Sequence, residues 1–362
     1  AAMGRSTLAM ADGNEVLADT VVLLQSSMSR AFGSSRERSS LNRGSSDAAS
    51  GVDDIPNLIN RTISEMKNFP GNQTLLQSGC RSLQVAAASG TNLQELMVDL
   101  GAQELAISAM WRFPQRWQLQ AACSNMLAAS VQWKEPLARH GGDAGAIEVM
   151  IAAVKRFPEV PEVRGILSNI GSFCDFVIEN RQRVNRAGGV ELALQLARGY
   201  YDAGTETSIQ CFFSTQCTPE ENTAAMVRGG YIPFSVQVMR DFPQAPARGE
   251  VLWVLNMCFD RDTTHLAAMV DAGIIEETIK VLKDGSAAGT FAAIDPISSD
   301  TRIGNAAMSL LGSLARENVT VGSMAVDAGA IEAIASVMLA FGDRSEQMPF
   351  GGELDILPTA CM

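Results

Sequence analysis

The chain has 362 residues, of which 46% are hydrophobic and only 6% aromatic, and its formal net charge is −12. The low aromatic content argues against a β-sandwich and favours closely packed helices. The acidic balance argues against nucleic-acid binding, which needs a basic surface. No apolar run reaches the ~20 residues that cross a bilayer, so we expect a protein that is not transmembrane, although peripheral attachment to a membrane complex stays open.

Residues 1–54 are predicted to form an arm ahead of the rest of the chain. The first eleven residues contain Arg, Ser and Thr but no acid, as in processed organellar import sequences, and a trimmed start explains them equally well. One amphipathic helix is expected within 14–32, and the Ser-, Gly- and Arg-rich stretch 32–51 predicts a flexible linker. Localisation therefore stays open between the cytoplasm and a plastid or mitochondrion.

A six-residue phrase with glycine at its second position recurs along the chain. Its copies are LGAQEL at 100–105, AGAIEV at 144–149, AGGVEL at 187–192, GGYIPF at 229–234, AGIIEE at 272–277 and AGAIEA at 328–333. Successive copies lie 42 to 44 residues apart, except that the last two are 56 apart. We assign the extra residues to an insertion loop at 285–300. Such a period indicates a structural repeat.

Each phrase opens an apolar helix, and a Phe-Pro pair is predicted to end three of these helices and one earlier helical run. In the clearest copy, Ile147, Met150, Ile151 and Val154 recur at i, i+3, i+4 and i+7, which is one face of a helix. Glycine permits a left-handed turn before the helix, and proline stops the helix after it. A third segment such as 117–131 then resumes helix. Because Phe69 implies an earlier, imperfect copy, we expect six to seven repeats over 55–342 and a tail at 343–362.

A helix pair of this size cannot bury its own apolar face, so the repeats must stack on one another. A period of ~40–47 residues indicates armadillo or HEAT repeats. The stretches DAGAIEVMIAAV (143–154), VRGILSNIGSF (163–173) and DAGAIEAIASVML (327–339) resemble armadillo repeats. The resemblance implies an all-α fold, a right-handed α-solenoid of armadillo-like repeats, with a HEAT-like superhelix as the alternative.

The resemblance also implies where a partner binds. In armadillo proteins the third helices line a concave groove, and asparagines near their ends hydrogen-bond the backbone of the partner. The matching residues here are Asn125, Asn169 and Asn256, and Trp117 and Trp253 are further candidates for groove contacts. An amide suits a peptide main chain because it both donates and accepts hydrogen bonds. The alternative is that each Asn bonds a backbone group within its own repeat.

The pattern of nuclear-import adaptors is absent. Those armadillo proteins carry a Trp four residues before the Asn, and the corresponding positions here hold Ala121, Gly165 and Leu252. We therefore do not expect this chain to recognise basic localisation signals.

A second candidate surface is a basic patch of Arg181, Arg183 and Arg186, which would dock an acidic or phosphorylated segment. The alternative is that these side chains belong to an ordinary solvated helix face.

Signatures of metal, cofactor or catalytic chemistry are missing. The seven cysteines form no CxxC pair, and we expect them to be reduced thiols that pack as small hydrophobes. There is no phosphate-binding loop, GxSxG or HExxH. His140 is placed in a turn and His265 at a helix start, neither with an evident partner. We therefore predict no enzyme, no cofactor and no metal.

The sequence thus predicts a non-enzymatic, intracellular scaffold or adaptor that binds a protein partner along the groove. The alternative is a structural or accessory subunit of a large complex, organellar and membrane-associated. Such a subunit would be held through the N-terminal arm, the 285–300 loop and the tail.

Overall fold

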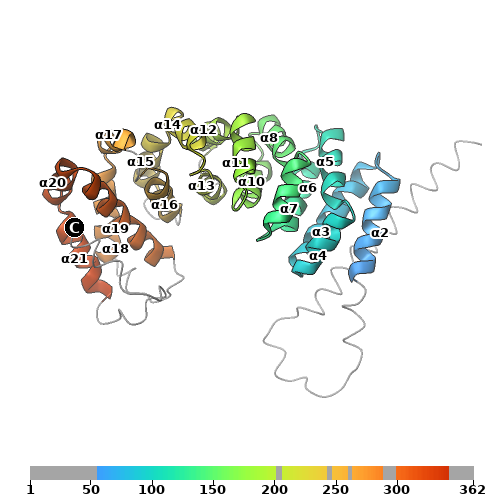
Figure 1. The fold of residues 1–362 in the computed structure, drawn as a ribbon, viewed down its shortest axis with the longest axis horizontal. Coiled ribbons are helices and arrows are strands. Elements are labelled where there is room, and N and C mark those ends of the chain that lie inside the picture. Colours follow the sequence, from blue (N-terminus) through green and yellow to red (C-terminus); the bar gives the residue numbers. More distant parts are fainter. Residues whose placement is uncertain (1–54, 201–205, 243–246, 260–262, 288–298, 342–362) are drawn as a thin grey trace, which may run out of the picture. The chain divides into compact units, whose positions relative to one another are not determined.

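The computed structural model describes residues 55–200, 206–242, 247–259, 263–287 and 299–341. Every regular element in these ranges is a helix (Figure 1). The chain divides into two compact units, residues 1–183 and 184–362. The arm at 1–54, with its expected helix, and the tail at 343–362 lie outside the described residues.

The first unit contains the helices α2 to α10 and most of α11. Their bounds are α2 Ile55–Asn68, α3 Gln73–Ala88, α4 Thr91–Asp99, α5 Ala102–Arg112, α6 Trp117–Val131, α7 Glu135–Asp143, α8 Ala146–Arg156, α9 Pro161–Arg164, α10 Ile166–Cys174 and α11 Ile178–Arg186. The repeat that begins at Gly145 has its third helix divided into α9 and α10 by Gly165.

The second unit follows the same order of helices. The bounds are α12 Gly189–Tyr200, α13 Glu206–Ser214, α14 Glu220–Arg228, α15 Tyr231–Asp241, α16 Ala247–Phe259, α17 Thr263–Ala272, α18 Ile274–Ala287, α19 Ser299–Glu317, α20 Val319–Asp327 and α21 Ala330–Phe341. Because α18 extends to Ala287 and α19 starts at Ser299, both ends of the expected 285–300 insertion are helical. Residues 288–298 lie outside the described ranges.

The predicted glycine turn is confirmed in all six phrases. The six glycines have φ between 69° and 96°, in the left-handed region, and they are Gly101, Gly145, Gly188, Gly230, Gly273 and Gly329. At Gly145 the backbone N–H donates to the carbonyl of Gly142 at 3.1 Å, which closes the end of α7 just before α8 begins. The turn thereby joins a short first helix to the second helix of each repeat.

The Phe-Pro corners are confirmed as well. Helices α5, α8 and α15 end one residue before Phe113, Phe157 and Phe242, whose φ angles of −120° to −130° leave the helical region. Each Phe still donates its N–H to the carbonyl four residues earlier, at 3.0 to 3.2 Å. The proline that follows cannot donate, so the helix stops there.

Neighbouring repeats bury each other's apolar faces within each unit. The predicted face of α8, formed by Ile147, Met150, Ile151 and Val154, is buried along its whole length. The third helices also pack side by side, α3 on α6 and α6 on α10 in the first unit, and α13 on α16 and α16 on α19 in the second. Each unit therefore presents a row of third helices.

A disulfide joins Cys80 of α3 to Cys123 of α6, which corrects the expectation that the thiols are reduced. The two cysteines lie 43 residues apart, one repeat period, so they occupy matching places on adjacent third helices. Their Cα atoms are 5.0 Å apart, within the range that a disulfide spans. The bond links the first two repeats of the stack covalently.

Replacing the turn glycine tests the role of its backbone conformation. Gly145→Ala is expected to lower the free energy of unfolding by about 1–2 kcal/mol, because a Cβ disfavours positive φ, although the nearest atom to that Cβ, an oxygen of Glu148, is 4.0 Å away. The matched control is Gly199→Ala within α12, where a Cβ has no neighbour within 4 Å. There the helical backbone favours alanine, and stability should be unchanged or rise by up to ~1 kcal/mol. Urea denaturation of both variants measures the difference, and equal effects would contradict this role.

Loss of the disulfide should be measurable in the folded chain. We expect Cys80→Ser to lower the free energy of unfolding by ~2–4 kcal/mol without reductant, since the cross-link constrains the unfolded chain. The difference from wild type should shrink when both proteins are reduced. Alkylation of the denatured protein followed by mass spectrometry should show Cys80 and Cys123 modified only after reduction. Modification of both without reductant would contradict the bond.

Candidate functional site

The helices α3, α6 and α10 of the third-helix row in the first unit are almost free of charge, and the short α9 of the same row adds Glu162 and Arg164. Arg81 is the only charged residue within α3, α6 and α10. Side-chain amides instead provide much of the polar character of these helices; those that are exposed or half-buried are Gln73, Gln77, Gln84, Gln118, Asn125 and Asn169. Uncharged groups that both donate and accept are suited to a peptide main chain.

Asn125 and Asn169 are brought together on adjacent helices. The Nδ2 of Asn169 donates to the Oδ1 of Asn125 at 2.8 Å and to the Oγ of Ser124 at 2.9 Å. Asn125 is exposed and Asn169 half-buried. Since each Asn lies 24 residues after its turn glycine, stacking of the repeats places the two side by side. The contact bonds one repeat to the next rather than to its own backbone, and it leaves the Nδ2 of Asn125 facing solvent.

Asn256 and Trp253 belong to the second unit, where both lie on α16. The Nδ2 of Asn256 donates to the Oγ of Ser309 in α19 at 3.0 Å, and its Oδ1 is buried without a hydrogen bond. Trp253 is exposed, as is Met257 one turn further along the same helix. The predicted groove residues thus form two sets, one in each unit.

Trp117 begins α6 and is half-buried, whereas an exposed aromatic pair lies at the other end of this helix. Trp133 and Phe176 have ring centroids 6.4 Å apart and are 75% and 54% exposed. Ile178, also exposed, follows Phe176 closely in the chain. Sequence reasoning missed Phe176, although it lies 31 residues after its turn glycine and Trp133 lies 32 after its own.

Trp133 has an unusual backbone conformation. Its φ is 62°, and no other non-glycine residue in the described ranges has a positive φ. This conformation costs roughly 1–2 kcal/mol for a residue with a Cβ. The next residue anchors the turn, because the Nζ of Lys134 donates to the carbonyl of Thr91 at 2.8 Å and to the Oε1 of Glu95 at 2.6 Å. Strained residues held by their surroundings cluster at binding sites.

The predicted arginine patch is largely engaged within the chain. Arg181 donates from Nε to the carbonyl of Cys174 at 2.7 Å and from Nη2 to that of Asp175 at 2.6 Å. Arg183 contacts the Oδ1 of Asp143 at 2.5 Å. Arg186 is exposed and lies beyond the boundary of the first unit. Arg181 and Arg183 therefore secure α11 to α10 and α7, and an acidic partner would have to compete with these contacts.

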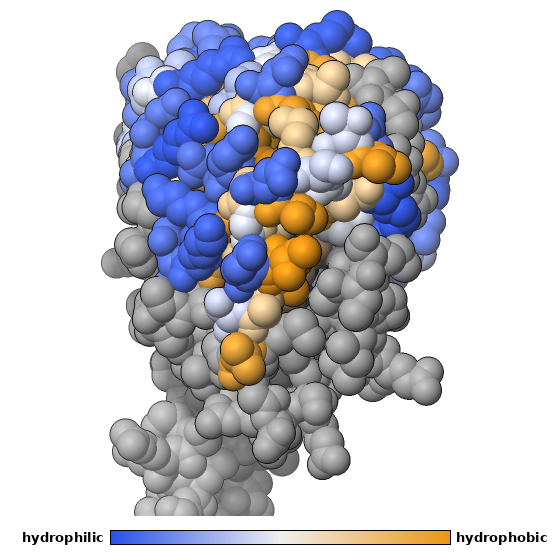
Figure 2. Space-filling view, turned by 90° about the vertical axis from the view of Figure 1, so that its left-hand side faces the viewer, coloured by the Kyte–Doolittle hydropathy of each residue, from blue (hydrophilic) through white to orange (hydrophobic). Residues whose placement is uncertain are grey.

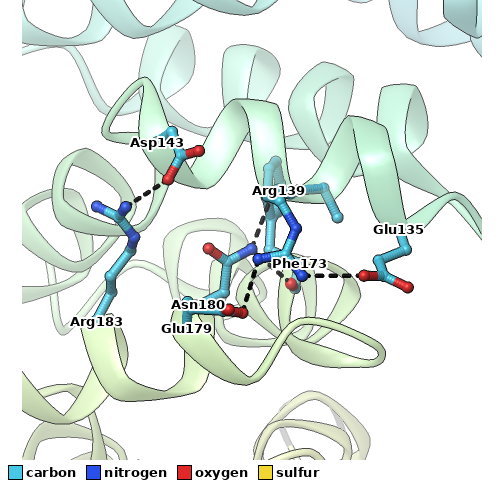
Figure 3. A network of polar contacts seen from close by, with 8 residues as sticks. Glu135, Arg139, Asp143, Phe173, Glu179, Asn180 and Arg183 are labelled. Atoms are coloured by element: carbon cyan, nitrogen blue, oxygen red, sulfur yellow. Dashed lines mark hydrogen bonds and ion pairs between the residues drawn. The ribbon is translucent and has the colours of Figure 1, made fainter.

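A polar network reinforces the same helices (Figure 3). Arg139 bridges Glu135 and Glu179, at 2.9 Å from each carboxylate. These carboxylates raise the pKa of Arg139, with the hydrogen bond to Glu135 the larger cause. The pKa of Glu179 is lowered, first by a hydrogen bond from its own backbone N–H and then by Arg139. Both shifts favour the charged forms, so the bridge is intact at neutral pH.

Beneath this bridge, Asn180 is buried and satisfies two backbone carbonyls. Its Nδ2 donates to the carbonyl of Ala138 at 2.9 Å and to that of Phe173 at 2.8 Å. Gly142 makes room for it, because a Cβ there would overlap the Asn180 side chain. The network has a structural role: it holds α7, α10 and α11 together.

Two further expectations concern chemistry. His140 lies within α7 rather than in a turn, and its Nε2 is 2.6 Å from the Oε1 of Glu104, so it has a partner that the sequence did not suggest. Within the described ranges, no three His, Cys, Asp or Glu side chains gather as a metal site. In the same ranges no single helix is long and apolar enough to cross a membrane, and only α20 combined with Ala330–Val337, bent by 70°, meets that test.

The strain at Trp133 predicts an unusual response to mutation. Trp133→Asn should leave the free energy of unfolding unchanged or raise it by up to ~1 kcal/mol, because Asn tolerates the left-handed conformation and offsets the lost ring contact. Trp111, an exposed residue within α5, is the matched control. Trp111→Asn relieves no strain and should lower stability. Thermal and urea denaturation measure both; a clear loss at Trp133 would show that it is a packing residue.

The comparisons with known proteins concern the fold. No family model and no curated protein matches the chain. Among solved structures, an engineered protein from a structural genomics consortium superposes with a TM-score of 0.63 at 16% identity, covering 94% of this chain and 76% of that one. A designed armadillo repeat protein gives 0.57 at 13% identity, covering 72% and 99%. Another, in complex with the peptide (KR)4, gives 0.58 at 13% identity with the same coverage.

These likenesses agree with the helices, the glycine turns and the stacking described above. At such low identity they bear on architecture alone. The predicted fold is confirmed: the chain is an α-solenoid with an armadillo-like repeat fold.

Proposed function

We propose that the third-helix row of the first unit binds an extended, weakly charged segment of a protein partner. The observation that carries this proposal is the combination of an amide ladder on α3, α6 and α10, which carry a single charged residue, and an exposed aromatic pair just beyond the C-terminal ends of α6 and α10. The proposed role is that of a non-enzymatic scaffold or adaptor, a role for which repeat solenoids are well suited because they leave a long surface free.

The amide ladder supplies contacts to the main chain of the bound segment. Asn169 donates to the Oδ1 of Asn125, which holds the Asn125 side chain while its Nδ2 remains available to a partner carbonyl. An amide held in place loses less conformational freedom on binding than a free one. Gln118, exposed on the same helix, adds a further donor and acceptor.

The aromatic pair supplies an anchor for an apolar side chain. Trp133 and Phe176 are large, exposed and already in contact, so a partner would cover both rings with little rearrangement. Aromatic residues carry much of the energy at protein interfaces, each worth about 2 kcal/mol or more at a hot spot. The contacts of Lys134 with Thr91 and Glu95 hold the turn that presents Trp133 in its left-handed conformation.

The charge of the row indicates which partners are excluded. The solved armadillo neighbour was captured with (KR)4, a strongly basic peptide. In α3, α6 and α10 no acidic residue is present to attract such a peptide, and α9 adds only Glu162, although the chain as a whole is acidic. We therefore expect a segment with aliphatic or aromatic anchors rather than a basic run.

The alternative role, a subunit of a large complex, depends on the arm, the insertion and the tail. These segments lie wholly or largely outside the described residues, so that role and the cellular compartment stay predictions.

A peptide selection tests the proposed function without knowledge of the partner. A random 12-residue library displayed on phage is selected against the full chain, and affinities of enriched synthetic peptides are measured by fluorescence polarisation. We expect peptides with apolar anchors and few charges. Asn125→Ala with Asn169→Ala should weaken binding about tenfold, as expected for two lost hydrogen bonds. Trp133→Asn should weaken it ~30-fold.

Matched controls separate the row from general surface effects. Asn57→Ala with Asn60→Ala, both exposed on α2, and Trp111→Asn on α5 should leave affinity unchanged. The (KR)4 peptide should bind more weakly than the selected peptides. Enrichment of basic peptides, or equal binding by the Asn125/Asn169 and Trp133 variants, would refute the proposal.

A further inference from the structure

The last repeat of the second unit exposes residues that earlier repeats bury. Two positions after the turn glycine, Val190, Ile232 and Ile275 are 0%, 1% and 1% exposed. The matching residue of α21 is Ile331, which is 58% exposed. The chemistry of the position is unchanged, so the difference lies in what covers it.

The same contrast appears one turn further along these helices. Six positions after the glycine, Leu194, Val236 and Ile279 are all buried, whereas Ala335 in α21 is exposed. Ile331 and Ala335 lie on one face of α21, and both are exposed although their counterparts in the other repeats are buried. The uncovered surface is the face that the second helix of an earlier repeat turns toward the repeat that follows it.

Other exposed apolar residues lie on the same helix and on α20, which precedes it. Figure 2 looks onto this end of the unit, where apolar atoms form a band between polar areas. We call the surface the terminal face; its exposed apolar residues are Val319, Met324, Val326, Ile331 and Leu339. By contrast α2, the first described helix, buries all its large apolar residues, which are Ile55, Leu58, Ile59, Ile63 and Met66. Large exposed apolar patches mark surfaces that bind something.

In the other repeats of this unit the cover comes from the chain that follows. Helix α18 packs against α19 and α21, and α15 packs against α16, α17 and α18. After α21 the next residues in the chain are 342–362. These residues therefore occupy the place in the chain order that supplies the cover elsewhere.

We propose that residues 342–362 pack across the terminal face as an intramolecular cap. The segment starts directly after α21 and has 21 residues, which reach up to ~70 Å when extended. Helix α21, with 12 residues, is only about 18 Å long. The tether also gives the segment a millimolar effective concentration at this surface.

The composition of the segment fits an extended strap rather than another helix. Pro349, Gly351, Gly352 and Pro358 interrupt any helical run. In the stretch 353–356, which reads ELDI, acidic and apolar residues alternate. In an extended chain this alternation puts Leu354 and Ile356 on one side and the two acids on the other. The apolar side would cover the terminal face while the acids stay in water.

Hydrogen exchange of the full chain tests the cap. Leu354→Ser with Ile356→Ser should accelerate exchange of α20 and α21 amides about tenfold, the change expected when roughly one large apolar side chain loses its cover. Ile331→Ser should have a similar effect, and adding it to the tail variant should add little, because both remove one contact. Exchange in α3 and α6 should be unchanged, which shows that the rest of the chain stays folded.

The matched control is Glu353→Ser with Asp355→Ser, which changes the other side of the same stretch and should leave exchange as in wild type. A second measurement uses a chain that stops at Phe341, to which the synthetic peptide 342–362 is added. The peptide should restore slow exchange in α21. Equal exchange in the tail variant and wild type, or no effect of the peptide, would overturn the cap.

Two other occupants give distinct results, and either would overturn the proposal. If a second copy covers the terminal face, light scattering will show a dimer that persists in the tail variant and dissociates with Ile331→Ser. If lipid covers it, the wild-type chain will float with vesicles of phosphatidylcholine and phosphatidylglycerol, and the tail variant will float equally well. A monomer that ignores vesicles and loses protection with the tail variant supports the cap.

Discussion

The structure depends on one backbone constraint, the left-handed turn at the glycine between the first and second helix of each repeat. At a φ of 69° to 96° the chain turns sharply between the first and second helix, and the helices on either side of Gly329 differ in direction by 70°. Neither helix hides its apolar face within the pair. The face is buried only when the next helix pair stacks on it in the same orientation. The spacing of 42 to 44 residues between most repeats gives successive pairs that orientation.

This constraint determines both candidate surfaces. Stacking in register brings equivalent residues of adjacent repeats side by side, which is why Asn169 meets Asn125 and why Cys80 meets Cys123. It places Trp133 near Phe176 by the same rule. No described repeat follows α21, so the face of α21 that a further repeat would bury is exposed. A binding row along the side and an apolar end are thus two consequences of one repeated geometry.

The sequence was sufficient for features that depend on local interactions. Glycine turns, Phe-Pro corners and the buried face of α8 each follow from residues close together in the chain. The adjacency of Asn125 and Asn169 follows once the register is known. The conformation of Trp133 could not be read, because it depends on Lys134 reaching α4. The hydrogen bond from Arg181 to the carbonyl of Cys174, at the end of α10, likewise depends on packing between helices. The 43-residue spacing of Cys80 and Cys123 does not by itself predict their bond, because Cys174 and Cys217 have the same spacing and Cys174 forms no disulfide.

The central claim is that register, rather than the content of any one repeat, holds the stack together. Deletion in register tests it most directly. Removing the 43 residues 230–272 joins Gly229 to Gly273 and keeps the order of the three helices, whereas removing the 22 residues 230–251 does not. The first shortened chain should remain helical and unfold cooperatively in urea with reduced stability, and the second should lose cooperative unfolding in this unit. Equal behaviour of the two chains would contradict the account.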